Sequence, residues 1–354
     1  MLVKPLLLLM SPYALSVLIS SLAIGTITTL SSTHWFLAWI GLEINTLAII
    51  PLITNKHHPR ATESATKYFL TQATASALIL FSTAINAWTL GEWTITNLNP
   101  ISSTILTIAL AIKLGIAPFH LWLPDVLQGL NLITGLILST WQKLAPIALL
   151  ILINHQLNSN LLVTIAILST IIGGWGGLNQ VQMRKIIAYS SIAHLGWIIL
   201  ILTFSPTLTI LNLIIYILLT TSIFIIIINL YSTNINKLAT SWLKTPTISA
   251  SIIITLIALG GLPPTSGFLP KWLILQEITK QHISLISTII AISALLSLFF
   301  YLRLSYTISL TTAPNISNSN LIWRTQLKPL SALSTTIVLS LLLIPITPLL
   351  LTIT

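Results

Sequence analysis

The sequence contains no cysteine, few charged residues and only five acidic side chains. Without cysteine the chain cannot form disulfides, thiolate zinc sites, cysteine-ligated iron–sulfur clusters or a cysteine nucleophile, so any redox chemistry must occur elsewhere. Only 6% of the residues are charged, whereas 55% are hydrophobic and the mean hydropathy is +0.98. This is far more apolar sequence than a soluble core requires. The composition therefore predicts an all-α polytopic membrane protein.

Hydrophobic runs long enough to cross a bilayer recur along the whole chain, and we count eleven of them. A membrane helix needs about twenty residues to cross about 30 Å of hydrocarbon. Continuous runs of this kind exclude a membrane β-barrel, whose strands alternate in polarity. The predicted spans are residues 6–28, 33–53, 66–88, 101–122, 126–153, 160–178, 186–204, 207–230, 247–275, 283–304 and 329–353.

The basic residues agree with this count. With eleven spans, Lys280 is the only lysine or arginine outside the hydrophobic centres of the spans that falls on the side opposite the amino terminus. This is a strong positive-inside bias. The net charge of +10 therefore reflects topology rather than nucleic-acid binding, and the basic face can also contact anionic lipid. The amino terminus is predicted to face the cytoplasm or an organellar matrix. The residues on its side are Lys4, Lys56, Arg60, Lys67, Arg184, Lys185, Lys237, Lys244, Arg303, Arg324 and Lys328.

Two predicted spans, the fourth and the ninth, contain glycine and proline in residues 113–125 and 260–272. Proline removes an amide donor and clashes with the preceding turn, so both helices are expected to break. Broken backbone at membrane depth is tolerated only where it is buried in protein or lines a hydrated cavity. The residues expected at the breaks are Gly115, Pro118, Gly261, Pro263 and Pro264.

The breaks occupy the same place in two successive groups of five spans. Because five is odd, the second group would cross the membrane in the opposite sense, which is the inverted-repeat plan of many transporters. We therefore divide one membrane domain into a first repeat at 1–155, a second at 156–305, and a loop with a final helix at 306–354. The alternative is two ordinary proline kinks with lysines that extend towards the membrane surface.

Four ionisable residues, Lys113, Lys143, Lys271 and Glu43, lie near the middle of hydrophobic stretches. Each costs about 2.5–3.5 kcal/mol at the bilayer centre on insertion scales, so a functional reason is expected. Burial disfavours the charged form of lysine and a nearby carboxylate restores it, which suits proton transfer. We interpret these residues as a proton path, with Glu43 near Lys113 and with Lys143 as a relay between Lys113 and Lys271. A structural ion pair between Glu43 and Lys113 is the alternative.

Two histidines, His120 in the first break and His194 within the seventh span, are accessory candidates because an imidazole titrates near neutral pH. A hydrogen-bonded packing role is an equal alternative for each. The glycine-rich segment 173–177 lacks the lysine of a phosphate loop, and no dinucleotide-binding fingerprint follows a strand. The chain itself is therefore not expected to bind NADH, another cofactor, a metal or nucleic acid.

Four segments together carry a resemblance. Residues 113–125, 141–146, 184–194 and 260–272 resemble the antiporter-like membrane subunits of respiratory complex I, and the resemblance extends over essentially the whole chain. It implies two inverted five-helix repeats, each with broken helices. By the motifs of that family, Glu43 and Lys113 match its glutamate–lysine pair, Lys143 its central lysine and Lys271 the terminal lysine of the second repeat. Some members have glutamate in place of Lys271.

The resemblance also implies an activity and a setting. Such a subunit translocates protons, coupled to electron transfer from NADH to ubiquinone, while FMN, iron–sulfur clusters and the quinone site belong to other subunits. Its partners are the other membrane-arm subunits, including neighbouring antiporter-like subunits, and the lipid bilayer. The implied location is the mitochondrial inner membrane, with the amino terminus in the matrix.

Two other functions use the same architecture. A stand-alone cation/proton antiporter would transport when reconstituted alone, whereas a complex I subunit is found with its partners. A structural membrane spacer would tolerate neutralisation of all four buried charges, whereas a pump would not.

Overall fold

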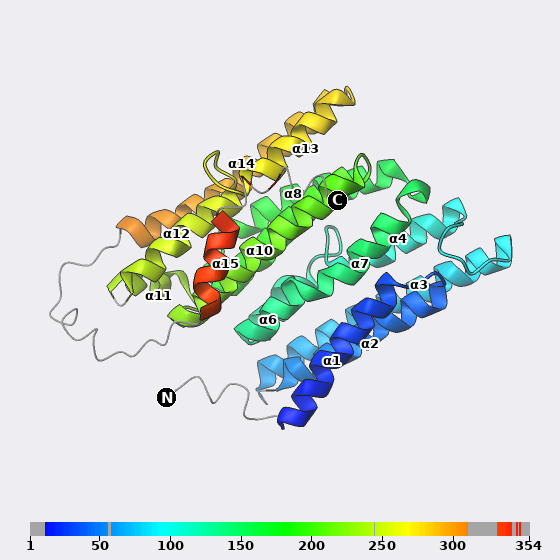
Figure 1. Cartoon of the computed structure of the whole chain (residues 1–354), viewed down its shortest axis with the longest axis horizontal. Coiled ribbons are helices and arrows are strands. Elements are labelled where there is room, and N and C mark those ends of the chain that lie inside the picture. Colours follow the sequence, from blue (N-terminus) through cyan, green and yellow to red (C-terminus); the bar gives the residue numbers. More distant parts are fainter. Residues whose placement is uncertain are drawn as a thin grey trace. The chain divides into compact units, whose positions relative to one another are not determined.

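The computed structural model describes residues 11–55, 58–243, 245–310, 331–341, 345 and 347. Within these ranges the regular structure is helical, and β-pairing is limited to two isolated bridges (Figure 1). The chain divides into two compact units, one ending at Ile165 and the other beginning at Ala166. Five of the basic residues predicted on the side of the amino terminus lie outside the described ranges: Lys4, Lys56, Lys244, Arg324 and Lys328.

The first unit contains seven α-helices and the start of an eighth. They are α1 (Pro12–Leu30), α2 (Trp35–Thr54), α3 (Pro59–Leu90), α4 (Pro100–Leu114), α5 (Trp122–Gly129), α6 (Leu132–Ser139), α7 (Trp141–Leu152) and α8 (Ser159–Gly177), with the short helix η2 (Asn154–Gln156) before α8. Within this unit α1 packs on α2, and α3 packs on α2, α4 and α5.

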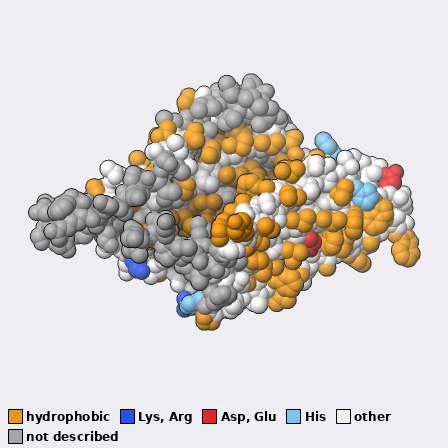
Figure 2. Space-filling view, turned by 60° about the horizontal axis from the view of Figure 1, so that its bottom comes forward, with side chains coloured by type: hydrophobic (Ala, Val, Ile, Leu, Met, Phe, Trp, Pro, Cys, Tyr) orange, Lys and Arg blue, Asp and Glu red, His pale blue; other side chains and the backbone are white. Residues whose placement is uncertain are grey.

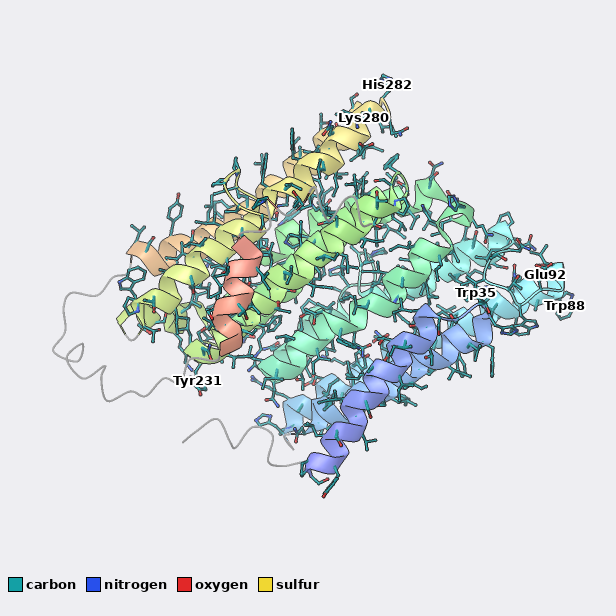
Figure 3. All side chains as sticks on the ribbon, viewed as in Figure 1. Trp35, Trp88, Glu92, Tyr231, Lys280 and His282 are labelled. Carbon is teal, nitrogen blue, oxygen red and sulfur yellow. The ribbon has the colours of Figure 1, made fainter. Side chains whose placement is uncertain are left out.

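The second unit contains the rest of α8 and seven further α-helices. They are α9 (Met183–Leu202), α10 (Pro206–Leu230), α11 (Ile235–Ala239), α12 (Pro246–Gly260), α13 (Phe268–Lys280), α14 (Ser284–Leu310) and α15 (Ser331–Leu341), with the short helix η3 (Thr240–Leu243) after α11. Within this unit α12 packs on α14 and α10, and α10 also contacts α9, α13 and α15. Figure 3 shows Lys280 and His282 at the tip of α13.

Eight helical segments of the described chain are long and apolar enough to cross a membrane. Two further apolar helices, α4 and α12, are shorter because each ends at one of the predicted breaks. About half of the eleventh predicted span lies outside the described residues, so the count of eleven stays a prediction. The fifth span begins at Leu132 rather than at residue 126, because residues 126–129 belong to α5, which ends at Gly129.

The helix ends follow from local sequence. Five helices, α1, α3, α4, α10 and α12, have proline in their first turn, where the missing amide donor would be unsatisfied anyway. The α1 helix is capped by Ser11, whose hydroxyl accepts a hydrogen bond from the backbone of Ala14. At their carboxyl ends, the helices α3, α4 and α12 stop at a glycine in the left-handed conformation.

The many serines and threonines are compatible with a membrane environment because their hydroxyls bond within their own helices. Ser82 in α3 donates to the carbonyl of Ile79, and Ser222 in α10 donates to that of Leu219. Polar groups without such partners would cost several kcal/mol in hydrocarbon. Outside, large apolar side chains such as Ile27 and Phe299 are exposed, and hydrophobic side chains cover much of the visible described surface in Figure 2. An apolar exterior of this extent fits contact with lipid tails.

Candidate functional site

The first helix break lies between α4 and α5. The α4 helix ends at Leu114, and Gly115 follows with a φ of 70°, a left-handed value that glycine adopts without steric cost. Its amide donates to the carbonyls of Ala111 and Ile112. The Trp122 indole, at the start of α5, donates back to the Ile112 carbonyl at 3.2 Å. The chain between residues 115 and 121 is therefore held against the end of α4, with Pro118 and His120 inside it.

The second break has the same construction. The α12 helix ends at Gly260, and Gly261 follows with a φ of 78°. Pro263 and Pro264 lie in the segment that runs to α13. A Cβ on Gly267 would stand 1.8 Å from the carbonyl oxygen of Ala258, so the two backbone segments approach as closely as glycine allows.

The two breaks can be superposed in sequence without a gap. Both α4 and α12 have 15 residues, begin with proline and stop before a left-handed glycine. Residues 115–125 then align with residues 261–271, and both segments end in Leu-Pro followed by a charged residue. That residue is Asp125 in the first unit and Lys271 in the second. The breaks thus share a backbone design but differ in the sign of one charge.

Lys143 lies on α7, and only 2% of it is exposed. Its Nζ donates a hydrogen bond to the carbonyl of Leu114, the last residue of α4, and stands 5.9 Å from the ring centre of Trp122. The end of a helix carries unsatisfied carbonyls and a partial negative charge. The partner of Lys143 is therefore a broken helix end rather than a carboxylate, which explains how this lysine lies in a helix without an acid nearby.

Lys113 lies in the last turn of α4, with 6% exposure. Its Nζ has no hydrogen-bond partner and no carboxylate within 4 Å among the described residues. Glu43 on α2 is near enough to act on it electrostatically, and the same carboxylate accepts a hydrogen bond from the Thr46 hydroxyl at 3.0 Å. The structure thus brings Glu43 and Lys113 into one neighbourhood but not into a direct ion pair.

Lys113 and Lys143 line one small buried cavity of about 20 Å³ in the first unit. This is room for about one water molecule. Polar side chains from α2, α3 and α7 complete the lining, among them Gln72, whose amide nitrogen is buried without a partner among the described residues. A cavity with unsatisfied donors on its wall has both the room and the hydrogen-bond partners for a water molecule. The other polar lining residues are Thr46, Tyr68 and Gln142.

The second unit has a comparable arrangement around Lys271, at the start of α13. Its Nζ donates to the carbonyl of Gly260, the last residue of α12, at 2.9 Å and stands 6.0 Å from the ring centre of Trp197. Lys271 and His194 line one cavity of about 10 Å³, at the lower limit for a water molecule. The Nε2 of His194 lies 3.4 Å from the Tyr301 hydroxyl.

The predicted site residues thus fall into two groups. In the first unit Lys113 and Lys143 share a cavity with Glu43 close by, and in the second Lys271 shares one with His194. His120 is buried in the first break but does not line the cavity of the two lysines. Among the described residues no group of three histidine or acidic side chains could hold a metal ion.

Several functional candidates were missed by sequence reasoning. They are the hydroxyl, amide and ring groups that line the two cavities: Thr46, Tyr68, Gln72, Trp122, Gln142, Trp197, Asn212 and Tyr216. Two of them, Tyr68 and Gln72, are four residues apart and therefore on one face of α3. Asn212 is a lone amide in an apolar helix. Polar residues at helical spacing within a membrane span are the signal that would have found them.

Apolar helices that stop at glycine and proline, with lysines at their carbonyl ends, are the architecture of many membrane transport proteins. The comparisons with known proteins name the family. Residues 32–297 match the family described as NADH:quinone oxidoreductase/Mrp antiporter, TM, and residues 298–351 match the NADH dehydrogenase subunit 2 C-terminus. The chain belongs to the NADH:quinone oxidoreductase/Mrp antiporter family, which confirms the resemblance seen in the sequence.

Curated relatives cover nearly the whole chain. The chain is 59% identical to NADH-ubiquinone oxidoreductase chain 2 of Xenopus laevis, over 97% of this chain and 100% of the relative. It is also 59% identical to the protein of that name from Squalus acanthias, over 96% and 98% of the two chains.

Solved structures show the same fold. A chain of respiratory complex I from Thermus thermophilus matches with a TM-score of 0.81 and 25% identity, over 95% of this chain and 80% of that one. A chain of the Mrp complex from Dietzia matches in fold, with a TM-score of 0.78 at 16% identity, over 94% and 75% of the two chains.

Proposed function

We propose that this chain is a core membrane subunit of respiratory complex I and that it translocates protons, coupled to electron transfer from NADH to ubiquinone. It lies in the mitochondrial inner membrane with its amino terminus in the matrix. Its partners are the other membrane-arm subunits, while NADH, FMN, iron–sulfur clusters and ubiquinone are bound by other subunits. The relatives over the full chain and the fold shared with a bacterial complex I chain support this proposal.

One observation carries the proton-translocating part of the proposal. Two buried lysines from different helices, Lys113 and Lys143, line the same small cavity, and Glu43 is held beside it through Thr46. A purely structural arrangement would leave no ammonium without a partner, because an unpaired charge in the membrane is costly, yet Lys113 has none among the described residues. Here the two lysines face a space that can hold water, and water between two amines allows a proton to pass from one to the other.

Glu43 is the group that can control this exchange. When its carboxylate is charged it favours the ammonium form of Lys113, and when it is protonated or screened by another charge that support is lost. The energies are of the right size. Moving one charge against 100 mV costs about 2.3 kcal/mol. Two unit charges 4 Å apart in a partly buried site interact by about 4 kcal/mol, and a more widely spaced pair such as Glu43 and Lys113 interacts by less. Making or losing this interaction is therefore comparable in size to the work of moving one proton.

Lys271 is the corresponding group of the second unit. It is held at the end of α12 by the Gly260 carbonyl, and His194 lines the same cavity, with Tyr301 as its hydrogen-bonding neighbour. In this proposal Lys271 and His194 carry the proton in the second unit, and Lys143 serves as the relay that follows Lys113.

The test is the Lys113→Ala variant in the assembled complex, reconstituted into vesicles. We expect the complex to assemble and to oxidise NADH, but with fewer protons translocated per electron, because the acceptor of the first cavity is missing. Lys280→Ala is the matched control, since Lys280 is an exposed lysine that pairs with Glu277. An assembled Lys113→Ala complex that pumps at the unmodified ratio contradicts the proposal.

A further inference from the structure

The α7 helix, which carries Lys143, has a proline in its interior, Pro146. In an α-helix each amide donates a hydrogen bond to the carbonyl four residues earlier, and proline has no amide hydrogen to donate. The carbonyl that loses its regular donor is that of Gln142, the residue directly before Lys143. A backbone carbonyl without a donor is costly at membrane depth. The Gln142 carbonyl therefore needs a hydrogen-bond donor from outside the regular pattern of its own helix.

This carbonyl belongs to the wall of the cavity of about 20 Å³ that Lys113 and Lys143 share. Gln142 and Pro146 both line that cavity. Because a helix carbonyl points along the axis towards the residue four positions later, the Gln142 oxygen is directed from one lining residue to the other. The side-chain amide of Gln142 is already engaged, since it donates to the Asn45 carbonyl of α2 at 3.3 Å. The backbone oxygen is thus the group that Gln142 offers to the cavity.

The unsatisfied side-chain groups of the same cavity are donors. Among the described residues, two buried side-chain atoms on its wall have no hydrogen-bond partner, the Nζ of Lys113 and the Nε2 of Gln72. Both atoms can only donate. One water molecule fits the space and can accept a hydrogen bond from each. The two hydrogens of that water then need acceptors, and a carbonyl oxygen without its amide donor is one. The two donors and the Gln142 carbonyl therefore complement one another through a single water.

We propose that the Gln142 carbonyl, freed by Pro146, is the acceptor that holds a water molecule against the Lys113 ammonium. This inference rests on the proposed function and identifies what fixes the water between its two amines. Pro146 is then a positioning residue, because it acts only by withholding the amide that would otherwise occupy the carbonyl. Since Gln142 directly precedes Lys143, a water on its carbonyl is held close to both lysines.

The competing explanation is that Pro146 only shapes α7 for packing, because proline bends a helix and this one is buried. The two explanations differ in what an added amide does. Any other residue at position 146 restores the bond to the Gln142 carbonyl, and alanine is a far better helix former than proline. If the proline serves packing alone, a side chain of similar bulk leaves proton translocation intact. If the carbonyl is the acceptor, every substitution occupies it.

The test compares three variants of the assembled complex, reconstituted into vesicles alongside Lys113→Ala. Pro146→Ala adds the amide and removes the ring, whereas Pro146→Val adds the amide and keeps most of the bulk. Pro51→Ala is the matched control, since Pro51 is the interior proline of α2 and does not line the cavity of the two lysines. The measurements are the protons translocated per electron, the rate of NADH oxidation, and the retention of this chain in the complex on heating.

We expect both Pro146 variants to assemble, to resist heating at least as well as the unmodified complex, and to translocate fewer protons per electron, with a loss up to that of Lys113→Ala. Pro51→Ala should keep the unmodified ratio. Normal pumping by either Pro146 variant would overturn the proposal, and so would an equal loss in Pro51→Ala. Failure of both Pro146 variants to assemble would also contradict it, because the proline would then be structural.

The same experiment separates this inference from the proposed function. If Lys113→Ala itself pumps normally, the proposed function fails. If Lys113→Ala is defective and the Pro146 variants pump normally, only the role of the Gln142 carbonyl fails.

Discussion

The two lysines of the first unit are expected to respond differently to replacement by methionine, which keeps their length and removes their charge. Removing a charge from the membrane centre gains about 2.5–3.5 kcal/mol on insertion scales. For Lys113→Met this gain is nearly complete, because the Nζ has no hydrogen-bond partner among the described residues. For Lys143→Met it is offset, since the Leu114 carbonyl loses its donor, at about 1–3 kcal/mol, and the end of α4 loses a cation. Lys113→Met is therefore expected to be the more stable variant by about 1–3 kcal/mol, which is roughly 5- to 150-fold in the equilibrium.

The assay is the fraction of this chain that remains in the purified complex over a series of temperatures in mild detergent, read on native gels. Each variant is compared with the unmodified complex, and the number of protons translocated per electron is measured in parallel. We expect both variants to lose pumping, and we expect Lys143→Met to be the less stable of the two. Equal destabilisation by the two substitutions would refute the reasoning, because Lys113 would then have a structural partner as good as that of Lys143.

Three further predictions concern other parts of the site. Glu43→Gln keeps an acceptor for Thr46 but removes the charge that acts on Lys113, so the complex should assemble normally and translocate fewer protons per electron; a normal ratio would exclude Glu43 as the controlling group. Gly267→Ala should sharply reduce the amount of assembled complex on native gels, because its Cβ would collide with the Ala258 carbonyl, whereas Gly91→Ala, with open space around its Cβ, should cost only about 1 kcal/mol for its left-handed backbone; equal yields would contradict this. Lys271→Arg should retain the bond to the end of α12 and therefore assembly, but lose pumping because arginine does not release its proton; full pumping would show that Lys271 need not titrate.

Much of the fold was predictable because its signals are local. Long apolar runs identify the spans, and glycine followed by proline identifies both breaks, since neither residue type continues a helix. The start of the fifth span was misplaced for a similar local reason. Residues 126–129 are apolar enough to join the following run, and only the end of α5 at Gly129 separates them from it.

The site was predictable in its charges but not in its contacts. A lysine in an apolar run is conspicuous in any sequence, so Lys113, Lys143 and Lys271 were singled out by their positions within hydrophobic stretches. That Lys143 would be held by the carbonyl of Leu114, 29 residues away, depends on how α7 packs on α4. Tertiary packing also decides that Tyr68 and Gln72 face the cavity of the two lysines, whereas their four-residue spacing within α3 indicates only that they share one face.

The bond from Lys143 to the last carbonyl of α4 has a consequence for how the charge of this residue can be regulated. An amide carbonyl does not accept or lose a proton at any physiological pH, so it attracts the ammonium equally at every stage of a cycle. A lysine paired with a carboxylate loses that attraction when the acid is protonated. A lysine paired with a backbone carbonyl keeps a constant local electrostatic environment. Any variation in the proton affinity of Lys143 must then come from outside this contact. The lysine therefore responds to electrostatic changes produced elsewhere in the chain.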